Sequence, residues 1–396
     1  MLKLRKLYLS LTRRQIESGE ISGTITIQLQ DENGNSQQTL ETIDIEFLST
    51  SALGEFLSPS SENSVTKTMA SGTANKNFRY RDSAEGEFTL TVNATGRDSG
   101  DMWSVSQIIT VETSVPPLPV TIIPGPITED TTWSPDGGVY MINSHFSVAE
   151  GITLTIEPGT IIKAKTTALG GPSIYGVLIA NGTSEQPIYF TSRFDDSVGG
   201  DSDGGGPSVG EPGQWQGLYF KPGSVGEFDN VTIRYAGDGG YGWGNFVGIE
   251  NDGGILSIKN SLIDQNNMHG IWQKDGDLTI ENSILSNQVF GLMTQGGETM
   301  ASSNEFRANT NYGVHASMGG SLELTDNNFI DNAKTAYVAA QVDFSHTGNT
   351  SADTANRGFE ITGNINDDTT WHTDDLPIII PNGGFVIVAT SGTLNI

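Results

Sequence analysis

The sequence predicts an all-β chain in which a small β-sandwich precedes a parallel β-helix of about 22 residues per coil. Glycine is frequent (49 of 396 residues) and charged residues are few (17%), against typical values of about 7% and about 25%, which favours turns over long helices. Short runs of alternating apolar and polar residues occur between residues 20 and 111, and an asparagine recurs at a near-constant interval between residues 230 and 327. We therefore expect two kinds of β architecture in one chain.

Proline content and a long-range repeat set the expected domain boundaries. Residues 114–126 hold five of the 15 prolines and are expected to form a semi-rigid linker. The segment Ile127–Trp133 returns much later as Ile365–Trp371, which predicts that a second β-helix module begins near the end and that the chain is a fragment of a longer modular protein. The expected segments are an N-terminal extension (1–16), a β-sandwich (17–113), the linker (114–126), a β-helix (127–357) and the truncated start of a second β-helix module (358–396).

The β-sandwich is predicted from period-two alternation in short segments separated by turn residues. Strands are expected at Thr24–Leu29, Ile43–Phe47 and Phe88–Val92, with turns such as Asp31–Asn35 between them. The phrases ITIQLQDENGN and NFRYRDSAEGEFTLTV resemble bacterial immunoglobulin-like (Ig-like) domains of surface proteins. That resemblance implies a spacer role for this module.

The β-helix is predicted from asparagines that begin similar segments at a step of about 22 residues, after one longer first step. Side-chain amides stacked at a bend can hydrogen-bond along the axis and satisfy backbone groups that the sheets leave free. The expected structural ladder consists of Asn230, Asn260, Asn282, Asn304 and Asn327. The longer step from Asn230 to Asn260 indicates an inserted loop.

Three upstream phrases carry a second resemblance. LTIEPGTIIK, GVLIANGTSEQPIYFTS and GQWQGLYF resemble the opening of right-handed parallel β-helix (pectate-lyase-like) domains in large secreted and cell-surface bacterial proteins. The resemblance implies the right hand, which the period alone does not fix, and an extracellular or cell-surface location.

Two groups of side chains are candidate ligand-binding residues. Alternation places Trp272, Met293 and His315 in an outward column if the preceding apolar residues face the interior, with Tyr337 on the interior side. Such a column could stack a sugar or bind a partner protein, and ordinary partial burial under a turn is the favoured alternative. The glycine-rich insertion carries Tyr241 and Trp243, which could bind a ligand or pack over a coil.

An acidic loop is a candidate Ca²⁺ site. Asp195, Asp196, Asp201 and Asp203 offer hard oxygen ligands on a glycine-rich backbone, which suits Ca²⁺. The loop lacks the bidentate Glu of an EF-hand, so a solvated loop is the alternative. No other cofactor is predicted.

Charge and composition restrict the partners. A formal charge of −27 would repel nucleic acid and anionic lipid surfaces, no apolar run is long enough for a membrane helix, and no Cys is present for disulfides or thiolate chemistry. We therefore expect no nucleic-acid partner and no membrane insertion. Polysaccharides, cell-surface glycans and neighbouring copies or modules remain the candidate partners.

Catalytic motifs are sparse. Asp264 and Asp331 are three coils apart, roughly 14 Å, which exceeds either carboxylate separation of glycoside hydrolases. The expected function is therefore a non-catalytic surface protein whose β-helix serves adhesion or glycan binding. A polysaccharide lyase or glycoside hydrolase is the alternative, and a purely structural stalk or filament subunit is the second alternative.

Overall fold

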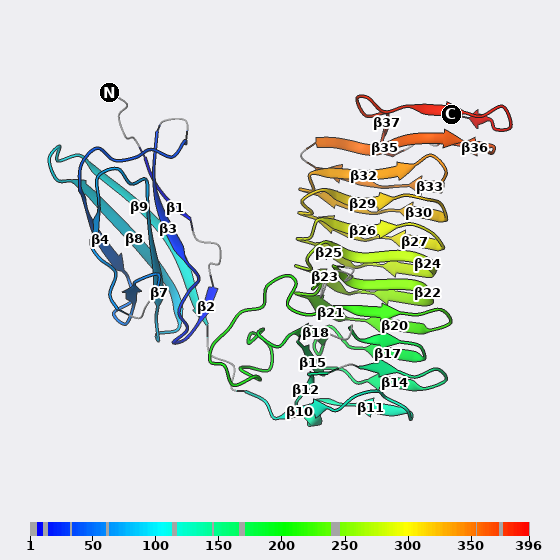
Figure 1. The fold of residues 1–396 in the computed structure, drawn as a ribbon, viewed down its shortest axis with the longest axis horizontal. Helices are drawn as coiled ribbons and strands as arrows, with labels where there is room; N and C mark the ends of the chain where they lie inside the picture. Colours follow the sequence, from blue (N-terminus) through cyan, green and yellow to red (C-terminus); the bar gives the residue numbers. More distant parts are fainter. Residues whose placement is uncertain are drawn as a thin grey trace. The chain divides into compact units, whose positions relative to one another are not determined.

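The computed structural model describes residues 6–10, 15–31, 34–60, 63–112, 117–144, 146–165, 171–238, 246–353, 355–371 and 375–395 (Figure 1). Its described residues are all-β apart from one 3₁₀ turn, η1 (Pro135–Gly137). Two compact units separate: residues 1–116 with 205–208, and residues 117–204 with 209–396. The all-β prediction is confirmed.

The first unit consists of two sheets around one apolar core, as in a β-sandwich. One sheet has the order β1-β3-β7-β5 and the other β2-β9-β8-β4-β6, and all neighbours are antiparallel except β2 and β9. Alternation explains the core: in β3, Ile25, Ile27 and Leu29 are fully buried while the residues between them are partly exposed. The strands are β1 (Lys6–Ser10), β2 (Gln15–Glu17), β3 (Ile25–Gln30), β4 (Ile43–Ser49), β5 (Glu55–Leu57), β6 (Thr68–Met69), β7 (Asn75–Arg81), β8 (Gly86–Gly96) and β9 (Met102–Glu112).

The first residues do not all lie outside this sandwich, as the expected extension 1–16 implied. Strand β1 pairs with β3, and its Leu7 and Leu9 are buried whereas Tyr8 is exposed. The basic, leucine-rich start of the chain therefore contains a strand, because its leucines alternate with polar or amphipathic residues.

The second unit is a parallel β-helix (Figure 1), as predicted, and its strands form three faces. Each coil contributes a strand to face A, then to face B, then to face C, and successive partners in the regular coils follow a period of about 22 residues. Face A is a separate sheet, whereas faces B and C belong to one folded sheet in which β22 (Val247–Lys259) and β24 (His269–Glu281) run through the corner.

The strands are grouped by face as follows. Face A contains β10 (Val120–Ile123), β12 (Val139–Ile142), β15 (Ile161–Ala164), β18 (Ile188–Ser192), β21 (Val231–Arg234), β23 (Leu262–Asp264), β25 (Ile284–Ser286), β28 (Glu305–Arg307), β31 (Asn328–Ile330) and β34 (Thr350–Ala352). Face B contains β13 (Ser147–Val148), β16 (Ser173–Ile174), β19 (Leu218–Phe220), β26 (Phe290–Thr294), β29 (Tyr312–Ala316), β32 (Lys334–Ala339) and β37 (Ile378–Ile379). Face C contains β11 (Thr131–Trp133), β14 (Thr153–Ile156), β17 (Val177–Asn181), β20 (Val225–Asp229), β27 (Glu298–Ser302), β30 (Ser321–Thr325), β33 (Asp343–Thr347) and β38 (Val386–Val388). Faces B and C share β22 (Val247–Lys259), β24 (His269–Glu281) and β35 (Ala355–Ile365), and β36 (Thr369–Thr370) pairs with β39 (Leu394–Asn395).

Parallel pairing crosses two of the expected boundaries. Strand β10 lies in the expected linker yet pairs with β12 on face A, because the prolines flank the strand rather than interrupt it. Strand β35 spans the expected boundary at 357/358 and pairs with β32 before it and with β37 and β38 after it. Residues 358–396 therefore stack on the same β-helix in the described part of the chain.

The interior of each coil is filled by stacked apolar side chains. On face A the inward column is Ile263, Leu285, Phe306 and Phe329, all fully buried, and the last two rings stack with centroids 5.0 Å apart. Glycine is the second residue of the face B strands where coils approach closely: a Cβ on Gly291, in β26, would lie 2.6 Å from a backbone oxygen of the next coil. The repeated glycine is thus a packing requirement.

The asparagines predicted to form one ladder are divided between two adjacent ladders at the corner from face C to face A. Asn230, Asn260 and Asn282 adopt positive φ (49 to 50°), and the Asn282 amide reaches Asn260 Oδ1 at 2.5 Å. Asn304 and Asn327 lie one position later and are buried. The shift arises because the coil from β25 to β28 is slightly shorter than the coil from β23 to β25.

That second ladder bonds both along the axis and to the backbone. The N–H and Nδ2 of Asn304 both donate to Asn327 Oδ1 at 3.0 Å, and Asn327 donates likewise to Asn349. Asn304 Nδ2 also donates to the Ile280 carbonyl at 2.9 Å. Side chains here replace the sheet bonds that the bend removes.

A third ladder, which the sequence analysis missed, lines the corner from face A to face B. Its members are buried polar side chains that accept from the backbone of the preceding coil: Asn266, Gln288, Asn309, Asn332 and Asp353. Both of these corners are therefore held by internal hydrogen bonds.

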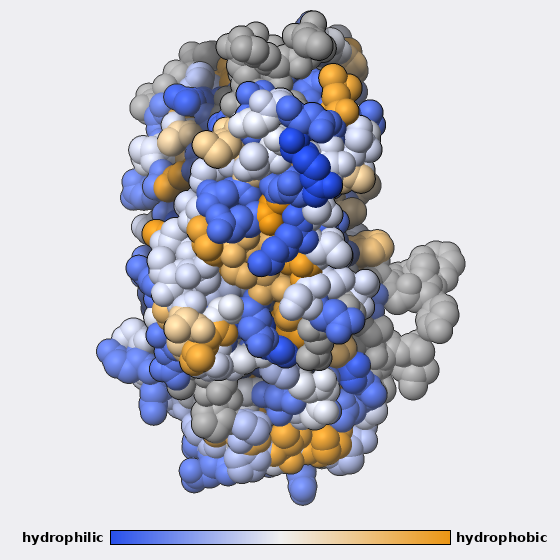
Figure 2. Space-filling view, turned by 90° about the vertical axis from the view of Figure 1, so that its left-hand side faces the viewer, coloured by the Kyte–Doolittle hydropathy of each residue, from blue (hydrophilic) through white to orange (hydrophobic). Residues whose placement is uncertain are grey.

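Among the described residues, no helix is long and apolar enough to cross a membrane. On the face drawn in Figure 2, hydrophobic residues occur in small groups separated by hydrophilic ones.

Candidate functional site

An outward column on face B carries large side chains on four successive coils. The parallel register aligns Trp272, Met293, His315 and Tyr337, and each is half-buried. The residues before them, Ile271, Leu292, Val314 and Ala336, are fully buried in the interior. Tyr337 therefore belongs to the outward column, which corrects its expected interior position. The strand register pairs Val314 with Ala336, so Ala336 faces the interior, because the step to this coil is one residue shorter than the spacing of the repeated segments suggests.

A second column runs beside the first. His269, Phe290 and Tyr312 are aligned at the start of the same strands, each directly before a glycine. Phe290 stacks between the other two, with ring centroids at 5.3 Å and 6.4 Å. The two columns touch, since His315 packs on Tyr337 at 4.8 Å and on Phe290 at 5.4 Å. We call these seven side chains the aromatic platform: His269, Trp272, Phe290, Met293, Tyr312, His315 and Tyr337.

The platform contains polar atoms that lack partners. Trp272 Nε1, His269 Nδ1 and His315 Nδ1 are buried and make no hydrogen bond within the described part of the chain. Burial, with the nearby His315, lowers the pKa of His269 to about 4, and burial also lowers the pKa of His315. Each unpaired buried group costs about 1–3 kcal/mol, so this arrangement is not explained by stability.

An ion pair closes the platform at its first end. Glu250 precedes Trp272 in the outward column and is 1% exposed. Its Oε1 lies 3.4 Å from Lys274 Nζ and 3.7 Å from Lys221 Nζ. The Lys274 ammonium also lies 4.9 Å from the centroid of the Trp272 ring.

A second ion pair closes the other end. Glu360 follows Tyr337 in the outward column and is also 1% exposed. It accepts from Tyr312 Oη at 2.5 Å and from Lys334 Nζ at 3.3 Å, while Lys334 donates to Tyr312 Oη at 2.9 Å. The hydrogen bond to Tyr312 raises the pKa of Lys334, and burial raises the pKa of Tyr312.

The two buried carboxylates are not a hydrolytic pair. Five strand spacings separate Glu250 from Glu360, roughly 24 Å at about 4.8 Å per strand, against at most about 9.5 Å in glycoside hydrolases.

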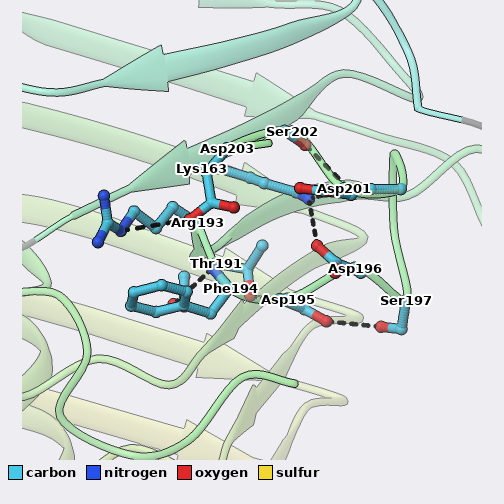
Figure 3. Close-up of polar contacts among 12 residues, drawn as sticks. Lys163, Thr191, Arg193, Phe194, Asp195, Asp196, Ser197, Asp201, Ser202 and Asp203 are labelled. Atoms are coloured by element: carbon cyan, nitrogen blue, oxygen red, sulfur yellow. Dashed lines mark hydrogen bonds and ion pairs between the residues drawn. The ribbon is translucent and has the colours of Figure 1, made fainter. Parts of the chain in front are cut away.

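The acidic loop lies between β18 and β19 and is tied to the protein's own cations (Figure 3). Asp195 Oδ2 accepts from Thr191 at 2.6 Å and from Arg234 Nε at 2.8 Å. Asp196 Oδ1 lies 4.0 Å from Nζ of the fully buried Lys163, which donates to the Gly200 carbonyl at 2.7 Å. Burial lowers the pKa of Lys163, opposed by the surrounding aspartates.

The other two candidate calcium ligands also have partners within the protein. Asp201 Oδ1 accepts from the Gly204 N–H at 2.8 Å, and Asp203 lies 3.6 Å from Arg193. In the described ranges, no group of three or more His, Cys, Asp or Glu side chains has a metal-binding arrangement. Calcium binding at this loop stays a prediction. Tyr241 and Trp243 lie outside the described residues.

Sequence reasoning found three members of the platform and missed four. A usable signal existed, because an aromatic residue precedes the repeated glycine at His269, Phe290 and Tyr312. The terminal ion pairs had no such signal, since Glu250 and Glu360 are far apart in the chain.

Comparison with known proteins agrees with the fold. Residues 216–394 match the family model described as a right handed beta helix region, and residues 125–206 match a pectate-lyase like beta helix domain. No curated protein matches significantly. A solved structure of a conjugative transposon lipoprotein from Bacteroides eggerthii is 12% identical over 26% of this chain and 94% of that chain, with a TM-score of 0.21. Residues 216–394 are therefore a right-handed β-helix region, and residues 125–206 are a pectate-lyase-like β-helix domain.

Proposed function

We propose that the chain is a non-catalytic surface protein that binds a glycan on the aromatic platform. The observation that carries the proposal is the run of large, half-buried, outward side chains at one position of four successive coils. Aromatic rings stack on the apolar faces of sugars, and a row with a spacing of about 4.8 Å suits an extended oligosaccharide.

Face C of the same coils provides an internal comparison. Its outward column in those four coils is Thr279, Met300, Glu323 and Ser345, which is largely polar. Stacking of the coils therefore does not itself demand aromatic side chains on an outward face. The first unit would act as a spacer of the Ig-like kind, and the acidic surface would keep an extracellular protein soluble.

Binding to an array of oligosaccharides, followed by calorimetry on the hits, tests the proposal. Trp272→Ala and Tyr337→Ala should each weaken binding about tenfold, because each removes one stacking ring worth about 1.4 kcal/mol. Tyr175→Ala is the matched control, since Tyr175 is 48% exposed and lies outside the platform. Equal loss in the control, or no loss in either platform variant, would contradict the proposal.

A further inference from the structure

We infer that the platform selects an uncharged glycan over an acidic one. This inference rests on the proposed function and names the class of its ligand. It concerns the charges at the two ends of the platform.

Each lysine beside the platform already has a buried carboxylate partner. Glu250 lies within 3.7 Å of both Lys221 and Lys274, and Glu360 lies 3.3 Å from Lys334. Both glutamates are 1% exposed, so water screens these pairs weakly. At the first end Asp252, 4.0 Å from Lys221, supplies the second negative charge, so the charges compensate locally at both ends.

The geometry also holds the lysines in place. Lys274 and Lys334 each lie 4.9 Å from the centroid of a platform ring, those of Trp272 and Tyr312. An acidic sugar would need a cation to compensate its carboxylate. Recruiting Lys274 would leave the buried Glu250 with Lys221 alone, and recruiting Lys334 would leave the buried Glu360 with only neutral donors, Tyr312 and Asn356. That step costs more than a solvent-exposed ion pair returns.

Elsewhere the protein adds repulsion rather than attraction. The formal charge is −27, so an anionic chain approaches against the field of the whole molecule. The remaining platform side chains are aromatic rings, a thioether and two imidazoles with lowered pKa values, which are neutral at pH 7. Contacts with them are apolar stacking and neutral hydrogen bonds.

Matched tetrasaccharide pairs test the inference by calorimetry at low salt. Each pair has the same linkage and differs only in the C6 group, hydroxymethyl or carboxylate, in the gluco, galacto and manno series. We expect at least one neutral member to bind, and its uronate counterpart to bind at least about tenfold more weakly. Added salt should narrow the difference, because screening reduces the repulsion.

Glu250→Gln and Glu360→Gln provide the second arm, with circular dichroism and melting curves as folding controls. Each substitution keeps the side-chain shape and leaves a lysine without its carboxylate, so uronate affinity should rise at least about threefold while neutral-glycan affinity changes less. Tighter binding of the uronates by the unmodified protein would overturn the inference and leave the proposed function standing. Absence of binding by every neutral and acidic member would overturn both.

Discussion

Asn332→Ala should be among the most destabilising single substitutions in the β-helix. The Asn332 side chain is fully buried; it accepts from the N–H and Nδ2 of Asn309 at 3.1 and 2.8 Å, and it donates to the Phe306 carbonyl and to Asp353 Oδ1, each at 2.8 Å. Alanine would leave these four polar groups buried without this partner. At about 1 kcal/mol for each group, the lower end of the measured range, the free energy of unfolding should fall by about 4 kcal/mol.

Urea denaturation followed by circular dichroism measures that loss, and hydrogen exchange of peptides covering residues 306–353 locates it. Asn328→Ala is the control, since Asn328 is only half-buried and its side chain accepts one exposed hydrogen bond, from Thr350 Oγ1 at 2.9 Å. The control should cost less than about 1 kcal/mol. Equal losses in the two variants would refute the reasoning that the buried corner ladder, rather than asparagine content in general, stabilises the coils.

Three further substitutions report on other features. Burial lowers the pKa of His269 from 6.5 to about 4, so the unfolded chain takes up a proton on this imidazole first as the pH falls. The free energy of unfolding should therefore decrease by up to about 3 kcal/mol between pH 6.5 and pH 4. Melting curves of His269→Phe over the same pH range should lack this decrease. Lys163→Met removes the fully buried cation beside Asp196 and should cost about 3–5 kcal/mol by urea denaturation, and an added Asp196→Asn should recover part of it, whereas additive losses would deny the coupling. Gly276→Ala should lower the melting temperature, because Gly276 has a φ of 79° and a Cβ there would collide with the Gly254 carbonyl; an unchanged melt would show that the corner can relax.

The coil length was predictable because a solenoid repeats one supersecondary unit, and its stacking positions recur in the sequence at the period of the coil. The exact register was not predictable, because neighbouring coils differ slightly in length and a slip by a single position exchanges inward and outward side chains. Tyr337 shows the consequence: the spacing from the closing residue placed it inside, whereas hydrogen-bonded pairing with His315 places it outside.

The charged parts of both candidate sites were harder to predict from sequence. Asp195 and Asp196 were evident as acids, but Lys163 and Arg234, which neutralise them, come from the separate strands β15 and β21 on either side of the loop in the chain. From the sequence alone such carboxylates look like free ligands for a metal ion, although in the folded chain lysine and arginine side chains pair with them. The same applies to Glu250 and Glu360, whose partners belong to other coils.

Corner residues and inward residues hold the coils together, whereas outward residues on the faces do not, and this difference supports a binding role for the platform. In a β-helix each coil contacts only its neighbours, and here the described corner ladders and the inward columns already bind those neighbours together. Outward positions are then under little structural constraint, as the polar outward column of face C in the same coils shows. On face B the equivalent positions carry three rings and one thioether beside a second column of rings. The platform also has three unpartnered buried polar atoms and an ion pair at each end, features that lower stability or leave it unimproved. Side chains that reduce stability at positions where coil stacking does not require them are expected at a binding surface. This is the physical reason to look for the ligand on face B.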